Sequence, residues 1–151
     1  MPFMALRQLP PVAAVISFID CINRGDTAGL GKLMTRDHEL AVFDEEPLRG
    51  RAANVEAWEG YASAFPGYVI YPHAIAEPRQ GQVAVLGHTT GSHLGLSDQE
   101  ERKLLVIWLA DVDSGKLRCW HLLKDTPARR HDLGLGIAAH GRPDPDPPAC
   151  S

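Results

Sequence analysis

Apolar residues in the first part of the chain recur at the spacing of amphipathic helices. Residues 11–24 place such side chains on one stripe, at Val12, Val15, Ile16, Ile19 and Ile22. Pro11 suits a first helical turn, and Gly25 is a typical helix end. Asp26 can cap a second, shorter helix whose inner face is Leu30, Leu33 and Met34. The pattern therefore predicts two consecutive helices at the start of the chain.

The next segment predicts a strand followed by a third helix. Residues 38–43 are short and rich in apolar side chains, and they lead into the acidic sequence Asp44-Glu45-Glu46-Pro47, which we interpret as a turn. Helical spacing returns over residues 51–65, with apolar side chains at Val55, Trp58, Tyr61, Ala62 and Phe65. Pro66-Gly67 ends this helix.

Four strand-like segments then follow one another, at residues 68–76, 82–92, 103–111 and 116–124. Turn-forming residues such as Asp113-Ser114-Gly115 separate them. Helices first and hairpin-linked strands afterwards predict the α+β fold class with an antiparallel sheet. We expect residues 1–134 to form one domain and residues 135–151, which are rich in Gly and Pro, to be a disordered tail.

The composition is that of a single soluble domain. The chain has 151 residues, of which 44% are apolar and 23% charged. A net charge of -4 without a clustered basic face excludes nucleic-acid binding. There is no apolar run that resembles a secretory signal or could span a membrane, and the three scattered cysteines predict no disulfide framework. We therefore expect a cytoplasmic protein.

One strand predicts an assembly. Residues 104–110 are apolar on both faces of the expected strand, whereas three helices can cover only one face of a sheet. Exposing the other face would forfeit roughly 1.5–3 kcal/mol for each large side chain. We expect a homodimer through that sheet face. The alternative is that the tail folds over it.

Motifs in the last third of the chain resemble those of the SnoaL-like polyketide cyclases, a group within the NTF2-like superfamily. Gly91-Ser92-His93-Leu94-Gly95 stands in the place of that group's Gly-Thr-His-x-Gly element. The run from Gly115-Lys116-Leu117 through Asp125 to Asp132-Leu133-Gly134 follows the group's spacing. The resemblance spans about residues 10–134. It implies an NTF2-like cone, with three helices from the N-terminal half packed on a curved antiparallel or mixed sheet, and cofactor-independent chemistry on a hydrophobic carbonyl compound.

The chain departs from this family and from a related one at informative positions. By the same spacing, the family's Glu becomes Cys119 and its Trp becomes His121. Asn23-x-Gly25-Asp26 and Val42-Phe43-Asp44 resemble segments of ketosteroid isomerases, but the position of their oxyanion-donating Tyr is taken by Phe18. A phenyl ring donates no hydrogen bond to an enolate, so ketosteroid isomerase activity is not expected.

Asp125 is the first candidate for chemistry. If its strand is regular, Asp125 shares one face with Leu117, Cys119, His121 and Leu123, and this face would line the concave side of the cone. The resemblance implies that Asp125 is the general acid/base, and His121 on the same face could relay or orient a proton. The alternatives are that Asp125 caps a turn or pairs with Arg129, and that His121 is a hydrogen-bonded core histidine.

Three further polar residues are candidates. His93 belongs to the motif shared with the family, and it could act in the pocket or bond to a loop carbonyl. His88 lies at odd spacing from His93, so a regular strand points the two to opposite sides unless Gly87 or Gly91 introduces a bulge. Asp44 occupies the place where the related family has its base, although three adjacent carboxylates also suit a solvated turn.

Aromatic and apolar residues are candidates for the substrate pocket. The stripe Trp58, Tyr61 and Phe65 forms one face of the third helix and can be either plain core or a pocket wall. The full predicted lining is Phe18, Phe43, Trp58, Tyr61, Phe65, Tyr71, His88, Trp108 and Cys119.

The sequence indicates neither a metal site nor a cofactor site. It has no HxH, HExxH or paired-Cys spacing and no glycine-rich phosphate loop after a strand. The leading hypothesis is a cofactor-independent enzyme of the cyclase or isomerase type that acts on a small hydrophobic molecule. The alternatives are a non-catalytic ligand-binding module and a dimerisation domain.

Overall fold

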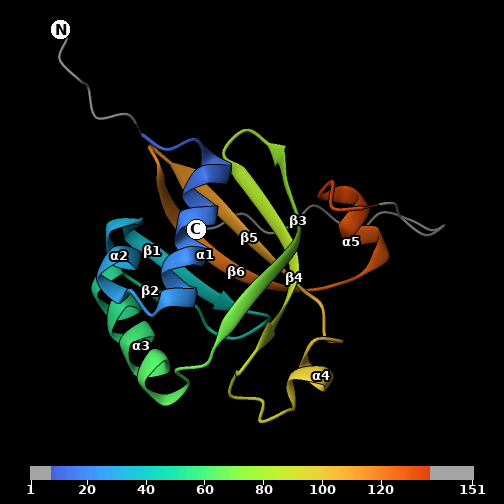
Figure 1. The fold of residues 1–151 in the computed structure, drawn as a ribbon. Coiled ribbons are helices and arrows are strands. Elements are labelled where there is room, and N and C mark those ends of the chain that lie inside the picture. The colour runs from blue at the N-terminus through green and yellow to red at the C-terminus, as the bar shows by residue number, and fades with distance from the viewer. Residues whose placement is uncertain (1–7, 137–151) are drawn as a thin grey trace, which may run out of the picture.

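The computed structural model describes residues 8–136 (Figure 1). Its elements are α1 (Pro11–Arg24), α2 (Thr27–Lys32), β1 (Met34–Val42), β2 (Leu48–Arg49), α3 (Arg51–Ala64), β3 (Val69–Arg79), β4 (Gln82–Thr90), α4 (Asp98–Glu101), β5 (Val106–Asp113), β6 (Lys116–Lys124) and α5 (Pro127–Asp132). The α+β class and the three early helices are as predicted. Three short elements were missed, namely β2, α4 and α5.

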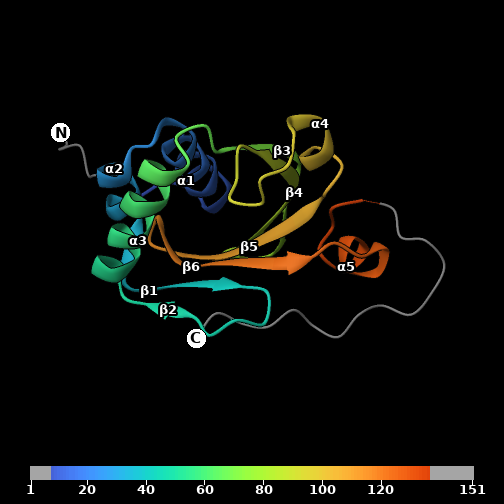
Figure 2. The same cartoon turned by 90° about the horizontal axis from the view of Figure 1, so that it is seen from below.

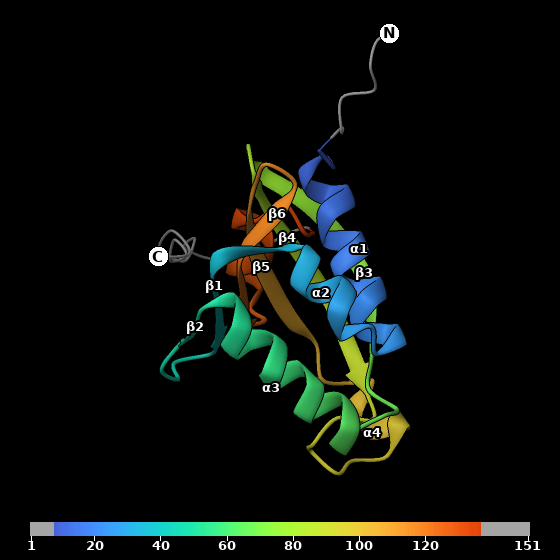
Figure 3. The same cartoon turned by 90° about the vertical axis from the view of Figure 1, so that its left-hand side faces the viewer.

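Six strands form one curved sheet in the order β2-β1-β6-β5-β4-β3. Every neighbouring pair is antiparallel except β1 and β6, which run parallel, so the sheet is mixed. Figures 2 and 3 show α1, α2 and α3 together on one side of this sheet. The sheet curves around these helices and forms the cone that the sequence predicted.

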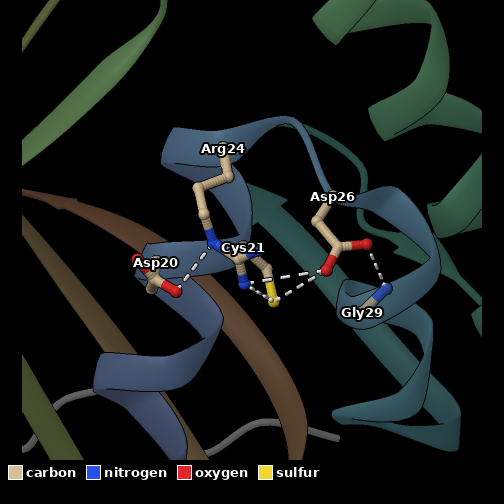
Figure 4. Close-up of polar contacts among 5 residues, drawn as sticks. All are labelled: Asp20, Cys21, Arg24, Asp26 and Gly29. Carbon is tan, nitrogen blue, oxygen red and sulfur yellow. Dashed lines mark hydrogen bonds and ion pairs between the residues drawn. The ribbon is translucent and has the colours of Figure 1, made fainter.

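The junction between α1 and α2 is fixed by local polar contacts (Figure 4). Asp26 caps α2, because its Oδ1 accepts a hydrogen bond from the Gly29 backbone N–H at 2.8 Å. Arg24, at the end of α1, donates to Asp20 at 2.9 Å. Burial raises the pKa of the Cys21 thiol, which lies beside Asp26, so this cysteine stays protonated and unreactive. These contacts join the end of α1 to the start of α2.

The main core lies between α1 and the concave face of the sheet. Phe18 is fully buried, and its ring centroid lies 5.1 Å from that of Trp120. Trp108, also fully buried, stacks on Trp120 at 6.1 Å. Burying three such rings removes on the order of 150–250 Å² each from water. The helices are therefore held against the middle of the sheet.

The opposite face of the sheet carries a second apolar cluster. Leu109 and Ile107 are fully buried there, in contact with residues that follow α5, including Leu133 and Leu135. The chain itself therefore covers much of the face from which a homodimer was predicted. The homodimer stays a prediction. The predicted disordered tail, residues 135–151, begins too early, because Leu135 is 6% exposed in this cluster, and residues 137–151 lie outside the described part.

Strand β6 departs from regular alternation. Leu109 pairs with His121 but Val112 pairs with Leu117, so β6 carries one extra residue between these pairs. Leu117 and Trp120 consequently both face the helices, as part of the main core. After one extra residue, each later side chain of the strand points to the face of the sheet opposite to the one that regular alternation predicts. The prediction that Cys119, His121 and Leu123 share the concave face with Leu117 is therefore wrong.

Cysteine pairing also differs from expectation. Cys21 is a free thiol, as a chain without a disulfide framework would predict. Cys119 is buried in β6 and disulfide-bonded. Three scattered cysteines gave no spacing from which a bridge could be inferred.

A buried histidine makes the fold sensitive to acid. His38 is fully buried in β1, and its Nδ1 lies 2.7 Å from the carbonyl oxygen of Leu117, to which the Nδ1–H donates. Its Nε2 has no hydrogen-bond partner among the described residues. Burial lowers the pKa of His38, because a proton on Nε2 would be a charge without an acceptor.

The free energy of unfolding is therefore expected to decrease as the pH is lowered. We expect this dependence on pH to be weaker in His38→Gln. The unfolded chain binds a proton at His38 below about pH 6.5, whereas the folded chain resists it. The contribution is complete above that pH and is lost as the pH falls toward the lowered folded pKa. Urea denaturation between about pH 7.5 and about pH 5 measures the slope, which is at most about 1.4 kcal/mol per pH unit for one proton. Equal slopes in the two proteins would contradict this account.

Candidate active site

An apolar cavity of about 200 Å³, which we call the aromatic cavity, lies between α3 and the concave face of β1 and β6. Helix α3 supplies one wall, and strands β1 and β6 supply the floor. Loop residue His93 closes one side. The lining residues are Leu40, Val42, Ala57, Trp58, Tyr61, Tyr68, His93, Trp120 and Leu122. None of them is a carboxylate, a lysine or an arginine. An engineered apolar cavity of about 150 Å³ can hold benzene, so this cavity fits a molecule with a single ring.

Tyr61 and His93 form a hydrogen-bonded pair in the wall of this cavity. The hydroxyl oxygen of Tyr61 lies 2.9 Å from Nδ1 of His93 and accepts a hydrogen bond from the His93 backbone N–H at 3.1 Å. The two rings meet edge to face at 5.8 Å, and Phe65 packs on Tyr61 at 4.8 Å. Two contacts to one hydroxyl fix both the loop and the orientation of the imidazole.

The direction of the Tyr61–His93 hydrogen bond depends on the tautomer of the imidazole. When Nδ1–H donates to the tyrosine oxygen, Nε2 keeps a lone pair that can take a proton, and the hydroxyl proton of Tyr61 is free for a ligand. When the hydroxyl donates to Nδ1, Nε2–H becomes a donor instead. Only the first tautomer offers a ligand both a basic ring nitrogen and a hydroxyl donor, because in the second the Nε2–H is the single free group.

A second tyrosine lines the same cavity, beside Trp58, whose indole nitrogen is buried. Burial strongly raises the pKa of Tyr68, whose hydroxyl has no hydrogen-bond partner within residues 8–136. Burial likewise raises the pKa of Tyr61, and the negative charge of Glu101 adds to the effect at both tyrosines. The indole N–H of Trp58 is buried and has no acceptor in the same part of the chain. Neutral donors without a fixed acceptor suit a ligand with carbonyl oxygens.

Asp125 does not line this cavity. Its carboxylate receives two hydrogen bonds from the Arg130 guanidinium, at 2.6 Å and 2.5 Å, so it ties the end of β6 to α5. This hydrogen bond raises the pKa of Arg130. The predicted position in the aromatic cavity is wrong, because the extra residue in β6 shifted the strand. The alternative of an ion pair was right in kind, although the partner is Arg130 and not Arg129.

Asp125 instead lines a second cavity, of about 420 Å³, which we call the rim cavity. It is lined by the parts of β1, β6 and the loop after β4 that closely follow, along the chain, the residues lining the aromatic cavity. Each of these segments contributes to both cavities, as Val42 and Phe43, Leu122 and Lys124, and His93 and Leu94. The rim cavity is lined by Phe43, Thr89, Leu94, Glu101, Lys103, Leu104, Leu105, Val106, Lys124 and Asp125.

Glu101 is a buried carboxylate that sequence reasoning missed. It is 1% exposed, accepts a short hydrogen bond from the Thr89 hydroxyl, and accepts one from the Ser92 backbone N–H at 3.3 Å. It therefore anchors the loop on which His93 stands. The only signal in the sequence was the capping box of α4, Ser97 with Glu100, inside a segment that we interpreted as a turn.

Three predicted polar residues lie apart from the aromatic cavity. His121 faces away from the helices, and its Nε2 lies 3.4 Å from the Phe43 carbonyl oxygen. Asp44 is exposed in the turn after β1, as the solvated alternative held. His88 is on the outer face of β4, where its Nδ1 lies 2.7 Å from Nε2 of His73 and its ring stacks on Tyr71.

The predicted pocket lining divides into three groups. Trp58 and Tyr61 line the aromatic cavity. Phe65 packs on the ring of Tyr61. Phe18 and Trp108 are core residues whose rings pack on Trp120. Phe43 lines the rim cavity instead. Tyr71, His88 and Cys119 lie on the outer face and do not contribute, so their placement in the pocket is corrected.

The fold and this cavity define an NTF2-like protein with an apolar pocket in its cone. The chain belongs to the SnoaL-like domain family, whose model matches residues 15–120. Comparison with curated protein sequences gives no significant match. None of the helices within residues 8–136 is both long enough and apolar enough to cross a membrane.

Solved structures share the fold at low sequence identity. An NTF2-like protein from Cytophaga hutchinsonii is 12% identical, with a TM-score of 0.62 over 80% of this chain and 95% of that one. SalBIII, an epoxide hydrolase/cyclase-like enzyme with a role in pyran ring formation in the polyether salinomycin, is 17% identical, with a TM-score of 0.62 over 75% and 88%. TerC, co-crystallised with polyporic acid, is 18% identical, with a TM-score of 0.62 over 83% and 98%.

Proposed function

We propose that this chain is a cofactor-independent enzyme of the cyclase or isomerase type, acting on a small carbonyl compound with a single ring. The observation that carries the proposal is the hydrogen-bonded pair of Tyr61 and His93 in the wall of an otherwise apolar cavity. Membership of the SnoaL-like family and the ring-forming role given to SalBIII support the reaction class.

In the proposed reaction His93 is the base. Nε2 takes a proton from the carbon next to the substrate carbonyl, and the electron pair of that C–H bond forms the enolate. The hydroxyls of Tyr61 and Tyr68 donate to the enolate oxygen, and their raised pKa values keep both of them protonated for this task. The imidazolium then returns the proton to the same carbon or another one. Alternatively, the enolate carbon attacks a second carbonyl, and the oxygen of that carbonyl takes the proton from the imidazolium as the new C–C bond forms.

The apolar walls contribute to this chemistry in a second way. Trp58, Trp120 and Leu122 hold the ring by apolar contact on the helix and sheet sides of the cavity, while His93 is exposed to solvent. A site made of donors and one base suits a neutral ketone that becomes an oxyanion during the reaction.

Proton exchange tests the proposal without knowledge of the natural substrate. The wild-type protein is incubated in D₂O with a panel of single-ring ketones, such as acetophenones and cyclohexenones, and loss of the α-proton signal is followed by NMR. We expect catalysed exchange for at least one ketone. Absence of exchange across the panel would contradict the proposal and favour the alternative function, a non-catalytic ligand-binding module. The lack of a carboxylate among the residues that line the aromatic cavity is consistent with that alternative.

The variant Asp125→Asn distinguishes this proposal from the role that the resemblance implies. We expect it to lose about 1–2 kcal/mol of unfolding free energy, because the Arg130 guanidinium loses its ionic partner. Exchange should stay within about threefold of the wild-type rate, since Asp125 lies outside the aromatic cavity. If the Asp125→Asn protein folds but catalyses no exchange, Asp125 and not His93 is the general acid/base.

A further inference from the structure

The rim cavity holds an unusual share of the exposed apolar surface. Phe43 is 38% exposed, Leu94 52% and Leu104 48%, and all three line this one cavity. They come from three separate segments, at the end of β1, after β4 and before β5. Large apolar side chains that gather around a hollow, and not singly over the surface, mark a binding site.

The edge of the same cavity carries unpaired positive charge. Lys103 and Lys124 are exposed, and neither ammonium has a salt-bridge or hydrogen-bond partner among residues 8–136. The two carboxylates of the cavity are already engaged. Asp125 is held by Arg130, and Glu101 is 1% exposed, with its oxygens turned to Thr89 and Ser92. The charge that remains accessible to a ligand is therefore positive.

The rim cavity adjoins the aromatic cavity. Sequence neighbours line the two cavities at two places, Val42 with Phe43 and His93 with Leu94, and Leu122 and Lys124 of β6 do so two positions apart. The two cavities are therefore close enough in space for two parts of one ligand to lie in them. The volume of about 420 Å³ exceeds that of the aromatic cavity and suits a flexible chain of several carbons.

We infer that the substrate carries an aliphatic arm ending in an anionic group, bound in the rim cavity with its carboxylate against Lys103 and Lys124. This inference rests on the proposed function for the placement of the ring, and it adds the chemistry of the second half of the substrate. The apolar residues bind the methylene groups, and the lysines select the charged end.

Matched ligands test the arm. Acetophenones with a para-linked carboxyalkyl arm of two to six carbons are compared with their methyl esters by isothermal titration calorimetry. At the best arm length we expect the acid to bind about fivefold more tightly than the ester, with the preference falling as salt is raised. Lys103→Gln and Lys124→Gln should each weaken binding of the acid by about two- to fivefold and leave the ester unchanged.

Lys32→Gln is the matched control, because Lys32 is an exposed lysine of α2 that lies outside both cavities. It should leave both affinities unchanged. Equal affinity of acid and ester, including an absence of binding by both, overturns the inference. So does a Lys103→Gln/Lys124→Gln double variant that keeps the full preference for the acid. Calorimetry measures binding without turnover, so the two proposals can fail separately. Preferential binding of the acid without exchange of α-protons would contradict the proposed reaction but support the inferred anionic arm.

Discussion

Replacing Tyr61 by phenylalanine is expected to slow α-proton exchange by about 10²–10³-fold, the usual effect of removing one donor to an oxyanion. The hydroxyl makes two contacts with His93, at 2.9 Å and 3.1 Å, so its loss also frees the imidazole and its loop. The ring contacts with Trp58, Phe65 and Tyr68 stay available to a phenyl group. Exchange is followed by NMR in D₂O, and ligand affinity by calorimetry on the same sample.

Tyr68→Phe provides the comparison for this variant. The Tyr68 hydroxyl has no hydrogen-bond partner in the described part of the chain, so its removal takes away a donor to the ligand and leaves the position of His93 unchanged. We therefore expect a smaller loss of rate, of about tenfold, at unchanged stability. Exchange by Tyr61→Phe at the wild-type rate would show that the aromatic cavity does not carry out the chemistry.

The second large effect is expected on stability, from alanine at Gly91. This glycine has a φ of +71°, and a Cβ there would lie within 2.3 Å of the carbonyl oxygen of Gly67, which cannot move without shifting backbone. The strain of the left-handed conformation and the clash together should cost about 2–5 kcal/mol. Urea denaturation followed by tryptophan fluorescence measures the loss. The displaced loop carries Ser92 and His93, so exchange should fall as well.

Gly95→Ala separates the two contributions. Gly95 has nearly the same φ, +70°, but an added Cβ would meet no atom within 4 Å. We expect only the conformational cost, about 1–2 kcal/mol. The difference between the variants then measures the approach of Gly91 to Gly67. Equal losses at the two positions would show that the backbone accommodates the contact.

Much of the fold followed from periodicity. Helix α1 has the predicted bounds, Asp26 caps α2 as expected, and β6 begins and ends where the sequence placed it. These elements have strong local signals in the form of an apolar stripe, a capping side chain and turn residues. The short elements β2, α4 and α5 have two to six residues, too few for a period to appear.

The site was predicted in part. Trp58, Tyr61 and His93 were all singled out, and the structure brings them to one cavity, because helix spacing places the first two on one face. Asp125 was misplaced because the extra residue in β6 depends on pairing with two neighbouring strands, and no local pattern in residues 116–124 reports it. Glu101 was missed because its partners, Thr89 and Ser92, are brought to it only by tertiary structure.

The parallel pairing of β1 with β6 sets the order in which the protein can assemble during translation. Residues 34–42 leave the ribosome long before residues 116–124, so the nascent chain presents β1 without its central neighbour while most of the sheet is still being made. Trp120 and Leu122 complete the floor of the aromatic cavity last. An early strand that waits for a late partner leaves one edge open to other chains until β6 has been made.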